Sequence, residues 1–211
     1  LPSVFTAGYY CDNQQGPVID FTLYPCPQGF YCPAGTNRST QHSCPAGTFG
    51  SRQKLRSIKE CQRCPPGKYC ELSGLAVPTG INECPAGHYC PTGTAFATQF
   101  PCPKGTYNPQ PGSNLMSHCI PCDPGHYCAL AGLPRVTGPC FAGFYCSRGV
   151  SSPTPTDGLL GNACPTGTYC PLGSAFPQPC PPGCYSNSTG NTGIEDCLLC
   201  DAGTMLKQRI N

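Results

Sequence analysis

Three pairs of cysteines have the spacing of metal ligands or redox thiols. They are Cys61 and Cys64, Cys119 and Cys122, and Cys197 and Cys200. Cys-x-x-Cys pairs are typical of zinc sites and thiol redox centres, and His118 and His126 lie near the middle pair. Paired zinc motifs usually lie about 12 to 20 residues apart, whereas these pairs are 58 and 78 residues apart. No strand-to-helix pattern surrounds them, so we expect neither a bound metal nor thiol catalysis.

Other catalytic patterns are also missing from the sequence. The 10 acidic residues are scattered, and there is no Gly-x-Ser-x-Gly nucleophile motif and no glycine-rich phosphate loop ahead of a helix. The net charge is only +2, and the densest basic cluster, at 52–59, has no aromatic residues between its charges. We therefore expect a protein that is not an enzyme, holds no cofactor and binds no nucleic acid.

The composition indicates a chain held together by disulfides. Of the 211 residues, 27 are Pro and 26 are Gly, which leaves little room for helices. Leu, Ile, Val and Phe together number 34, too few for a single hydrophobic core in a chain of this length. The 21 Cys can supply cross-links that offset the missing burial, and disulfides persist in oxidising compartments. We expect an extracellular protein, either secreted or at the cell surface.

Two further segments bear on the expected location. Residues 158–194 carry no charged side chain, but Pro, Cys and Asn interrupt every apolar run, so we expect no insertion into a membrane. Residues 1–7 lack the charged and apolar regions of a signal peptide, and we therefore expect a mature or excised chain.

The chain is built from an internal repeat. Ten segments begin with Cys and carry Gly three residues later, and nine of these carry an aromatic residue five residues after the cysteine. The repeats, each named below by its opening residue, begin at Cys26, Cys44, Cys64, Cys84, Cys102, Cys122, Cys140, Cys164, Cys180 and Cys200. Met205 replaces the aromatic residue in the last repeat. An eleventh, degenerate copy has Phe5, Gly8 and Tyr10 at the three positions.

The repeats are of two kinds. In a short repeat the second cysteine follows the aromatic residue directly, as in Cys64-Pro-Pro-Gly-Lys-Tyr-Cys70. In a long repeat the second cysteine lies 17 residues after the first, as at Cys44 and Cys61. The six cysteines from Cys26 to Cys70 recur 58 residues later. We expect repeat blocks at 1–63, 64–121 and 122–199, the third with one extra short repeat, and the start of a further repeat or a tail at 200–211.

The repeat predicts a small disulfide-rich fold with short β-hairpins. Cys-Pro-x-Gly suits a type I turn, with Pro at the second position. The aromatic residue is expected to lie against a neighbouring disulfide or the preceding aromatic residue, in place of a single hydrophobic core. We expect at most one helical turn, near Leu206 to Ile210. Because units of about 20 residues contact mainly their neighbours, an elongated rod is predicted.

The cysteines are expected to form a disulfide framework whose pairing the sequence leaves open. The framework consists of Cys11, Cys26, Cys32, Cys44, Cys61, Cys64, Cys70, Cys84, Cys90, Cys102, Cys119, Cys122, Cys128, Cys140, Cys146, Cys164, Cys170, Cys180, Cys197 and Cys200. Pairing in chain order makes three tight Cys-x-x-Cys bridges and leaves only Cys184. Pairing within repeats leaves Cys11, Cys184 and Cys200. Cys184 is odd in both schemes, so an intermolecular bridge and an ordinary local pairing both stay open for it.

The long repeats resemble a known extracellular module. Cys102-Pro-Lys-Gly-Thr-Tyr107, followed by Cys119-Ile-Pro-Cys122, is similar to the ephrin-receptor-like cysteine-rich repeat, with a more general likeness to tumour-necrosis-factor-receptor and EGF-like arrays. The resemblance implies a non-catalytic building block of receptors, adhesion molecules and surface coats. It also favours bridges within the long repeats, from Cys44 to Cys61 and from Cys102 to Cys119.

The sequence contains two N-glycosylation sequons, and it supports two functional interpretations. Asn37-Arg38-Ser39 and Asn187-Ser188-Thr189 are N-glycosylation acceptors, so we expect a glycoprotein. The first interpretation is a structural or adhesive protein that serves as a spacer, a surface coat or a filament subunit, with other copies of itself or other extracellular proteins as partners. The alternative is a fragment of a ligand-binding receptor ectodomain. Its candidate contact residues are Phe96, Phe100, Leu115, Met116, Leu159 and Leu160.

Overall fold

The computed structural model describes residues 6–12, 20–78 and 82–201. The chain divides into two compact parts. The first part comprises Leu1–Cys102 and Asn108–Cys119, and the second comprises Pro103–Tyr107 and Ile120–Asn211. The predicted helical turn near Leu206 lies outside the described residues, and the predicted block boundaries stay a prediction.

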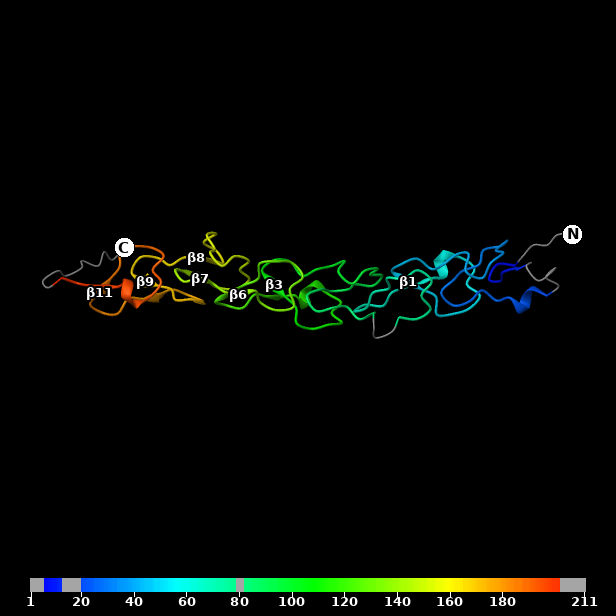
Figure 1. Ribbon diagram of the computed structural model, residues 1–211, viewed down its shortest axis with the longest axis horizontal. Helices are drawn as coiled ribbons and strands as arrows, with labels where there is room; N and C mark the ends of the chain where they lie inside the picture. The colour runs from blue at the N-terminus through cyan, green and yellow to red at the C-terminus, as the bar shows by residue number, and fades with distance from the viewer. Residues whose placement is uncertain (1–5, 13–19, 79–81, 202–211) are drawn as a thin grey trace. The chain divides into compact units, whose positions relative to one another are not determined.

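The regular structure consists of two-stranded antiparallel pieces and short 3-10 turns, and the described residues contain no α-helix (Figure 1). The strand pairs are β1 (Thr48–Phe49) with β2 (Gln62–Arg63), β3 (Thr106–Tyr107) with β4 (Ile120–Pro121), β5 (His126–Tyr127) with β6 (Gly138–Pro139), β7 (Phe144–Cys146) with β8 (Gly161–Ala163), β9 (Thr168–Tyr169) with β10 (Gln178–Pro179), and β11 (Cys184–Tyr185) with β12 (Leu198–Leu199). The 3-10 turns are η1 (Phe21–Leu23), η2 (Ile58–Glu60), η4 (Met116–His118) and η5 (Ile194–Asp196). These pieces confirm the predicted disulfide-rich hairpin fold.

The turn that opens each repeat differs from the predicted one. In the Cys44 repeat Thr48 donates its N–H to the carbonyl of Pro45, so the reversal runs from Pro45 to Thr48 and begins one residue later than expected. Gly47 is therefore the third residue of the turn, and its φ is 82°. A positive φ at that position is the requirement of a type II turn, so the type I prediction was wrong. The glycine is needed for its conformation and is not merely tolerated.

Nine disulfides close the repeats from within. The six short bridges span six residues each and join Cys26 with Cys32, Cys64 with Cys70, Cys84 with Cys90, Cys122 with Cys128, Cys140 with Cys146, and Cys164 with Cys170. The three long bridges span 17 residues and join Cys44 with Cys61, Cys102 with Cys119, and Cys180 with Cys197. The pairing within repeats is therefore the one present, and the pairing in chain order is not.

Three cysteines stay free, namely Cys11, Cys184 and Cys200. The predicted framework included Cys11 and Cys200, which form no disulfide within this chain, as the pairing within repeats expects. The residue six positions before Cys11 is Phe5, and the residue six positions after Cys200 is Leu206. Neither cysteine therefore has a partner at the short-repeat spacing within this chain.

Main-chain hydrogen bonds connect each repeat to the next. In the first part Cys64 donates its N–H to the carbonyl of Gly47, and Gly47 in turn donates to Cys70, at 2.9 and 2.8 Å. Cys70 donates to the carbonyl of Thr94 in the following repeat, and Gly93 donates back to Cys64, at 3.1 and 2.8 Å. Four bonds of the polypeptide backbone thus link neighbouring repeats without using any side chain.

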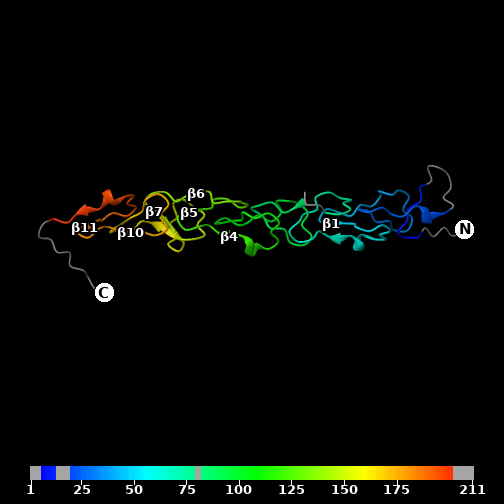
Figure 2. The same ribbon diagram turned by 90° about the horizontal axis from the view of Figure 1, so that it is seen from below.

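The second part repeats this pattern. Cys140 donates to Gly125 and Gly125 donates to Cys146, at 2.9 and 2.8 Å. Cys146 donates to Ser174 and Gly173 donates back to Cys140, both at 2.9 Å. Figure 2 shows the strand pair β5 and β6 of the second part, whose strands lie directly beside Gly125 and Cys140 in the sequence. The same backbone groups are therefore used at equivalent positions in both parts.

Half-cystines take the place of a hydrophobic core. Among the described residues the only buried aliphatic side chains are Leu55 and Val150, and the other buried hydrophobic residues are all cysteines. Tyr127 packs against Cys140, Cys146 and Val150, so a repeat tyrosine does lie against the disulfide of the next repeat. No single hydrophobic core exists in the described part of the chain, which agrees with the small number of aliphatic residues.

Other aromatic residues of the repeat contact a ring across the hairpin. Tyr31 stacks on His42 with ring centroids 5.4 Å apart, and Tyr89 lies 5.6 Å from Phe100. Both partners lie two residues before the cysteine that opens the next repeat. Within the described ranges no ring contact joins two aromatic residues at the repeat position. Of the two predicted neighbours of the repeat aromatic residue, the disulfide is therefore found at Tyr127 and the preceding aromatic residue is not.

Candidate functional site: the seats between repeats

A recurring pair of opposed residues forms a small surface on every repeat. One member is the fourth residue after the opening position, and the other is the residue just before the next opening cysteine. We call each such pair a seat. The seats are Tyr9 with Pro25, Phe30 with Ser43, Thr48 with Arg63, Lys68 with Glu83, His88 with Pro101, Thr106 with Pro121, His126 with Pro139, Phe144 with Ala163, Thr168 with Pro179, and Cys184 with Leu199.

In the repeats that open from Cys26 to Cys180 a second turn carries a residue in the left-handed region, and where this residue is glycine we call it the second glycine. The second glycines are Gly35, Gly74, Gly93, Gly112, Gly132, Gly149, Gly173 and Gly190, with φ between 76 and 87° except at Gly112, where φ is 70°. Lys54, with φ 64°, takes this place in the Cys44 repeat and is the only described residue other than glycine with a positive φ. Its ammonium group lies 5.1 Å from the ring centre of Tyr9, a seat residue.

Five of the ten seats lie against the second glycine of a later repeat, at Phe30, Arg63, Glu83, Pro121 and Pro139. A Cβ atom built on Gly93 would lie 3.8 Å from Cδ of Arg63, and one on Gly173 would lie 3.5 Å from Cβ of Pro139. The same construction places Gly149 at 3.7 Å from Pro121. In each case the glycine belongs to the second repeat after the one that contains the seat. Seats therefore extend the contact from the adjacent repeat to the next but one.

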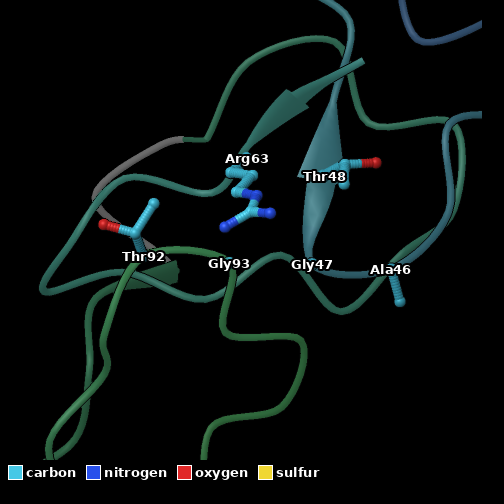
Figure 3. Close-up of a pocket in the computed structure, with 6 residues that line it drawn as sticks. All are labelled: Ala46, Gly47, Thr48, Arg63, Thr92 and Gly93. Carbon is cyan, nitrogen blue, oxygen red and sulfur yellow. The ribbon is translucent and has the colours of Figure 1, made fainter. Parts of the chain in front are cut away.

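Figure 3 shows one filled seat in detail. A small pocket is lined by Ala46, Gly47, Thr48, Arg63, Thr92 and Gly93. The Arg63 side chain reaches from its strand toward the turn that contains Thr92 and Gly93, while Thr48 lies on the opposing strand. The pocket is thus the space between a seat and the turn it receives, and its side chains offer packing rather than acid–base chemistry.

We call the glycine three residues after each opening cysteine the first glycine. The close approach of two backbones at this junction explains why the first glycine recurs. A Cβ on Gly47 would lie 2.7 Å from the carbonyl oxygen of Gly93, and one on Gly143 would lie 2.6 Å from that of Gly190. Real Cβ atoms do not approach a backbone oxygen so closely, so any side chain here would push the two repeats apart. The glycine satisfies both the turn conformation and the contact between repeats.

Several junction elements have no such contact among the described residues, and Gly190, with no described atom within 4 Å of a Cβ built on it, is one of them. The last seat, Cys184 with Leu199, receives no second glycine among the described residues, and Leu199 is 80% exposed. Toward the other end, Gly35 is exposed, and no described atom lies within 4 Å of a Cβ built on it. These surfaces are of the kind that is covered elsewhere in the chain.

The three free cysteines have different surroundings. Cys11 is buried, and burial raises the pKa of its thiol. Cys184 lies opposite Leu199 in the last strand pair, whereas the N–H of Cys200 bonds to Gly183. Because successive residues of a strand face opposite sides, Cys184 and Cys200 do not face each other. The seat therefore contains a half-exposed thiol at a position that is Thr in β1, β3 and β9.

Two of the three Cys-x-x-Cys pairs are divided between different disulfides, and in the third Cys197 is bonded to Cys180 while Cys200 is free. Cys61 bonds to Cys44 and Cys64 bonds to Cys70, so the two sulfur atoms belong to separate repeats. The pair formed by Cys119 and Cys122 is divided in the same way. Bonded sulfur atoms are not thiolates and cannot serve as zinc ligands in this state.

The predicted glycosylation residues both lie on the surface. Asn37 and Asn187 are exposed, and they occupy loops between framework cysteines. Glycan attachment at these residues stays a prediction. Of the candidate receptor contacts, Phe96, Leu115 and Met116 are exposed by 52, 55 and 56%. Phe100, in contrast, packs beside Tyr89.

Sequence reasoning missed the seats and two buried polar pairs, Asn108 with Ser113 and Ser186 with Asn191. The seat residues vary from Phe to Lys, so no residue type marks them, although their fixed offsets from the cysteines do. The polar pairs lie only in long repeats, where the residue after the aromatic one is not cysteine. The absence of cysteine directly after the aromatic residue was the signal in the sequence that could have revealed these polar pairs.

Comparison with known proteins gives no relative for this chain. No family model matches the sequence, and no curated protein matches it significantly. No helix in the described part of the chain has the length and apolar character needed to cross a membrane. The protein is stabilised by disulfides, and its disulfide content fits an extracellular or secreted protein.

Proposed function

We propose that this chain is a non-enzymatic extracellular structural or adhesive protein. Its stacked repeats would serve as a spacer, a surface coat or the subunit of a filament. The observation that carries this proposal is the use of the same main-chain hydrogen bonds and seats at the junctions described, with close glycine contacts at several of them. Nearest-neighbour contacts of one kind are the hallmark of repeat proteins, whose length is set by the number of repeats.

The distribution of cysteine supports this role. Eighteen of the 21 cysteines are bonded within nine repeats, so the sulfur chemistry of the chain is used almost entirely for cross-linking. We also propose that the repeats belong to the ephrin-receptor-like class and that Asn37 and Asn187 carry glycans. Glycans are typical of coats and adhesive surfaces in the extracellular space.

Deletion of one repeat block tests the structural proposal. Removing residues 64–121 joins Arg63 to Cys122 and keeps the cysteine pattern in register, because Cys64 and Cys122 open equivalent short repeats. We expect the variant to fold with three fewer disulfides and to show a maximum dimension in X-ray scattering that is shorter in proportion to the repeats removed. A folded variant whose maximum dimension is unchanged would contradict a spacer role.

An alternative is a receptor fragment that binds a protein ligand. The adjacent exposed residues Leu115 and Met116 favour this reading, because neighbouring exposed apolar side chains are common at binding hot spots. Recovery of a distinct extracellular partner that is lost on the double substitution Leu115→Ser and Met116→Ser would support it. Recovery of only the protein itself would weaken it.

A further inference from the structure

The charged residues are unevenly distributed along the chain. Residues 38–68 contain seven of the 12 Lys and Arg but only one of the 10 acidic residues, Glu60, so this segment carries a net charge of +6. The remaining residues contain five basic and nine acidic side chains, a net charge of −4. The near-neutral total therefore includes a strongly basic segment, which lies within the first part of the chain.

The backbone of this segment is held in place, and its basic side chains are exposed. Leu55 is only 3% exposed, and its carbonyl accepts a hydrogen bond from the N–H of Cys32, at 2.8 Å. The N–H of Lys54 donates to the carbonyl of Cys26, at 2.9 Å. With Leu55 buried, the basic side chains around it are exposed. We call them the basic cluster, which consists of Arg52, Lys54, Arg56, Lys59 and Arg63.

The arginines of the basic cluster are not neutralised by carboxylates. All ten acidic residues lie in the described ranges, and there none of them forms an ion pair with Arg52, Arg56 or Arg63. The carboxylate of Glu60 accepts a hydrogen bond from the main-chain N–H of Arg56, at 3.1 Å, and not from a guanidinium group. Because like charges gathered on one surface attract anions, the basic cluster is suited to an anionic partner.

One member of the basic cluster lines a pocket. Figure 3 shows the guanidinium group of Arg63 between the strand of Thr48 and the turn that contains Thr92 and Gly93. Within the described ranges this guanidinium group makes no hydrogen bond to the protein. A guanidinium group presents five N–H donors in a planar fork that fits the oxygens of a sulfate group. The pocket can therefore hold one anionic group while the other cations of the cluster contact its neighbours.

We propose that the basic cluster binds a linear sulfated polysaccharide, with one sulfate group in the pocket beside Arg63. Such a polymer carries many anionic groups at short intervals, which suits several cations on one ordered loop. Short segments rich in Lys and Arg are typical of binding sites for sulfated polysaccharides and for nucleic acids. Residues 52–63 include no aromatic side chain on which a base could stack, which favours the polysaccharide. This binding activity goes beyond the structural role proposed above.

Calorimetric titration of the full chain with heparin, a sulfated polysaccharide, tests the binding. We expect the triple variant Arg52→Gln, Arg56→Gln and Arg63→Gln to lose at least about tenfold in affinity, because three charge-assisted contacts are removed.

A matched control removes the same amount of charge elsewhere. The triple variant Lys104→Gln, Arg135→Gln and Arg148→Gln changes three exposed residues outside the cluster, and it should bind heparin like the wild type. Thiol titration should find three free thiols in each folded variant. Equal losses of affinity in the two triple variants would show that only net charge matters, and would overturn the cluster as a site.

The salt dependence and the choice of polymer identify the ligand. Binding of a polyanion releases counterions, so the affinity should fall with salt, and the slope of the logarithmic plot should be smaller by about two to three in the cluster variant than in its control. Equal affinity for heparin from which the sulfate groups have been removed would overturn sulfate as the recognised group. Equal affinity for a single-stranded oligonucleotide would assign the cluster to nucleic acid instead.

Arg63→Lys tests the pocket separately. Lysine keeps the charge but lacks the planar fork, so this variant should bind heparin more weakly than the wild type. Arg52→Lys is the matched control, because Arg52 does not line the pocket, and it should bind like the wild type. Equal affinities of these two variants would overturn the pocket as the sulfate site.

The failure of this binding and that of the structural role give different results. If the wild type does not bind heparin, the binding proposal is wrong, and the spacer role is still decided by X-ray scattering of the block deletion. If the deletion variant keeps its maximum dimension while the wild type binds heparin through the cluster, the spacer role alone is contradicted.

Discussion

The side-chain amide of Asn108 donates a hydrogen bond to the hydroxyl of Ser113, at 2.8 Å. The Cys180 repeat has the same bond with the residues exchanged, since Asn191 donates to Ser186 at 2.8 Å. All four residues are buried. In short repeats the first of these two positions holds a half-cystine, so the polar pair occupies the place of the missing short disulfide in two long repeats.

Exchanging Asn108 and Ser113 should therefore be tolerated. Asn108 also donates to the carbonyl of His88, and Asn191 donates to that of Thr168, which is the equivalent residue of the preceding repeat. The amide thus reaches the same carbonyl from either position. We expect the double variant Asn108→Ser and Ser113→Asn to lose less than about 1 kcal/mol of unfolding free energy, whereas Asn108→Ala should lose about 1 to 3 kcal/mol. Guanidinium denaturation measures both, and equal losses would contradict this account.

Substitutions at two first glycines can distinguish the cost of a strained backbone from the cost of a close approach between two repeats. Gly47 and Gly167 have φ values of 82 and 75°, but a Cβ on Gly47 would meet the Gly93 oxygen at 2.7 Å, while no described atom lies within 4 Å of one on Gly167. We expect Gly167→Ala to cost about 1 to 2 kcal/mol for its left-handed backbone. Gly47→Ala should cost at least about 1 to 3 kcal/mol more, because two backbones must separate. Similar thermal midpoints for the two variants would show that the contact contributes little.

The long and short bridges should contribute unequally. The Cys44–Cys61 bridge closes a span of 17 residues, and the Cys64–Cys70 bridge closes a span of six. Chain entropy predicts a loss of about 3 kcal/mol when the first is replaced by two serines and about 2 kcal/mol for the second. Chemical denaturation of the two double variants measures this order, and a larger loss from the short bridge would contradict it.

The loop around Asp157 should loosen in acid. Its carboxylate accepts hydrogen bonds from the N–H groups of Leu159, Leu160 and Gly161, and bonds from Leu160 and Leu159 are the main causes that lower the pKa of Asp157. A lowered folded-state pKa contributes stability above the unfolded value of about 3.9, and that contribution is lost as the pH falls through the folded value.

Amide hydrogen exchange at Leu159 and Leu160 measures this effect. After correction for the intrinsic rate, protection should be constant above about pH 5 and decline below about pH 4. Asp157→Asn should show no such decline. Protection that is equally pH-dependent in the variant would assign the effect to another group.

Glycan occupancy should follow the exposure of the two sequons. Asn37 and Asn187 are exposed, as is the hydroxyl residue Thr189, while Ser39 is half-buried. After secretion from a eukaryotic host, peptide-N-glycosidase should convert both asparagines to aspartate, which mass spectrometry detects. Asn37→Gln and Asn187→Gln are the matched controls, and unmodified peptides from the secreted protein would contradict the prediction.

The sequence predicted the fold where cysteine and glycine define it. The offset of Tyr69 between Cys64 and Cys70 located the short repeat, and the pairing within repeats was one of two schemes it left open. The turn type was wrong because Cys-Pro-x-Gly fits two kinds of turn: Gly47 can be the fourth residue of a type I turn or the third residue of a type II turn, and the hydrogen bond from Thr48 to Pro45 decides between them. Local sequence does not contain that information.

The candidate site was beyond the sequence for a related reason. A seat such as Thr48 with Arg63 joins residues 15 positions apart, and its glycine lies a further 30 residues along the chain. The residues at these positions range from Tyr to Pro because they contact a backbone turn rather than a specific side chain. Only their periodic offsets are constant, and these acquire meaning once the strand register is known.

The main-chain hydrogen bonds that recur between repeats need no side chain, and this affects how such a chain can change over evolutionary time. A duplication or loss of one repeat leaves every remaining junction chemically intact, because each junction needs only cysteine, glycine and the peptide group. Substitutions in the intervening loops alter the surface without weakening these bonds. Recognition properties can therefore diversify from repeat to repeat while the architecture is inherited unchanged.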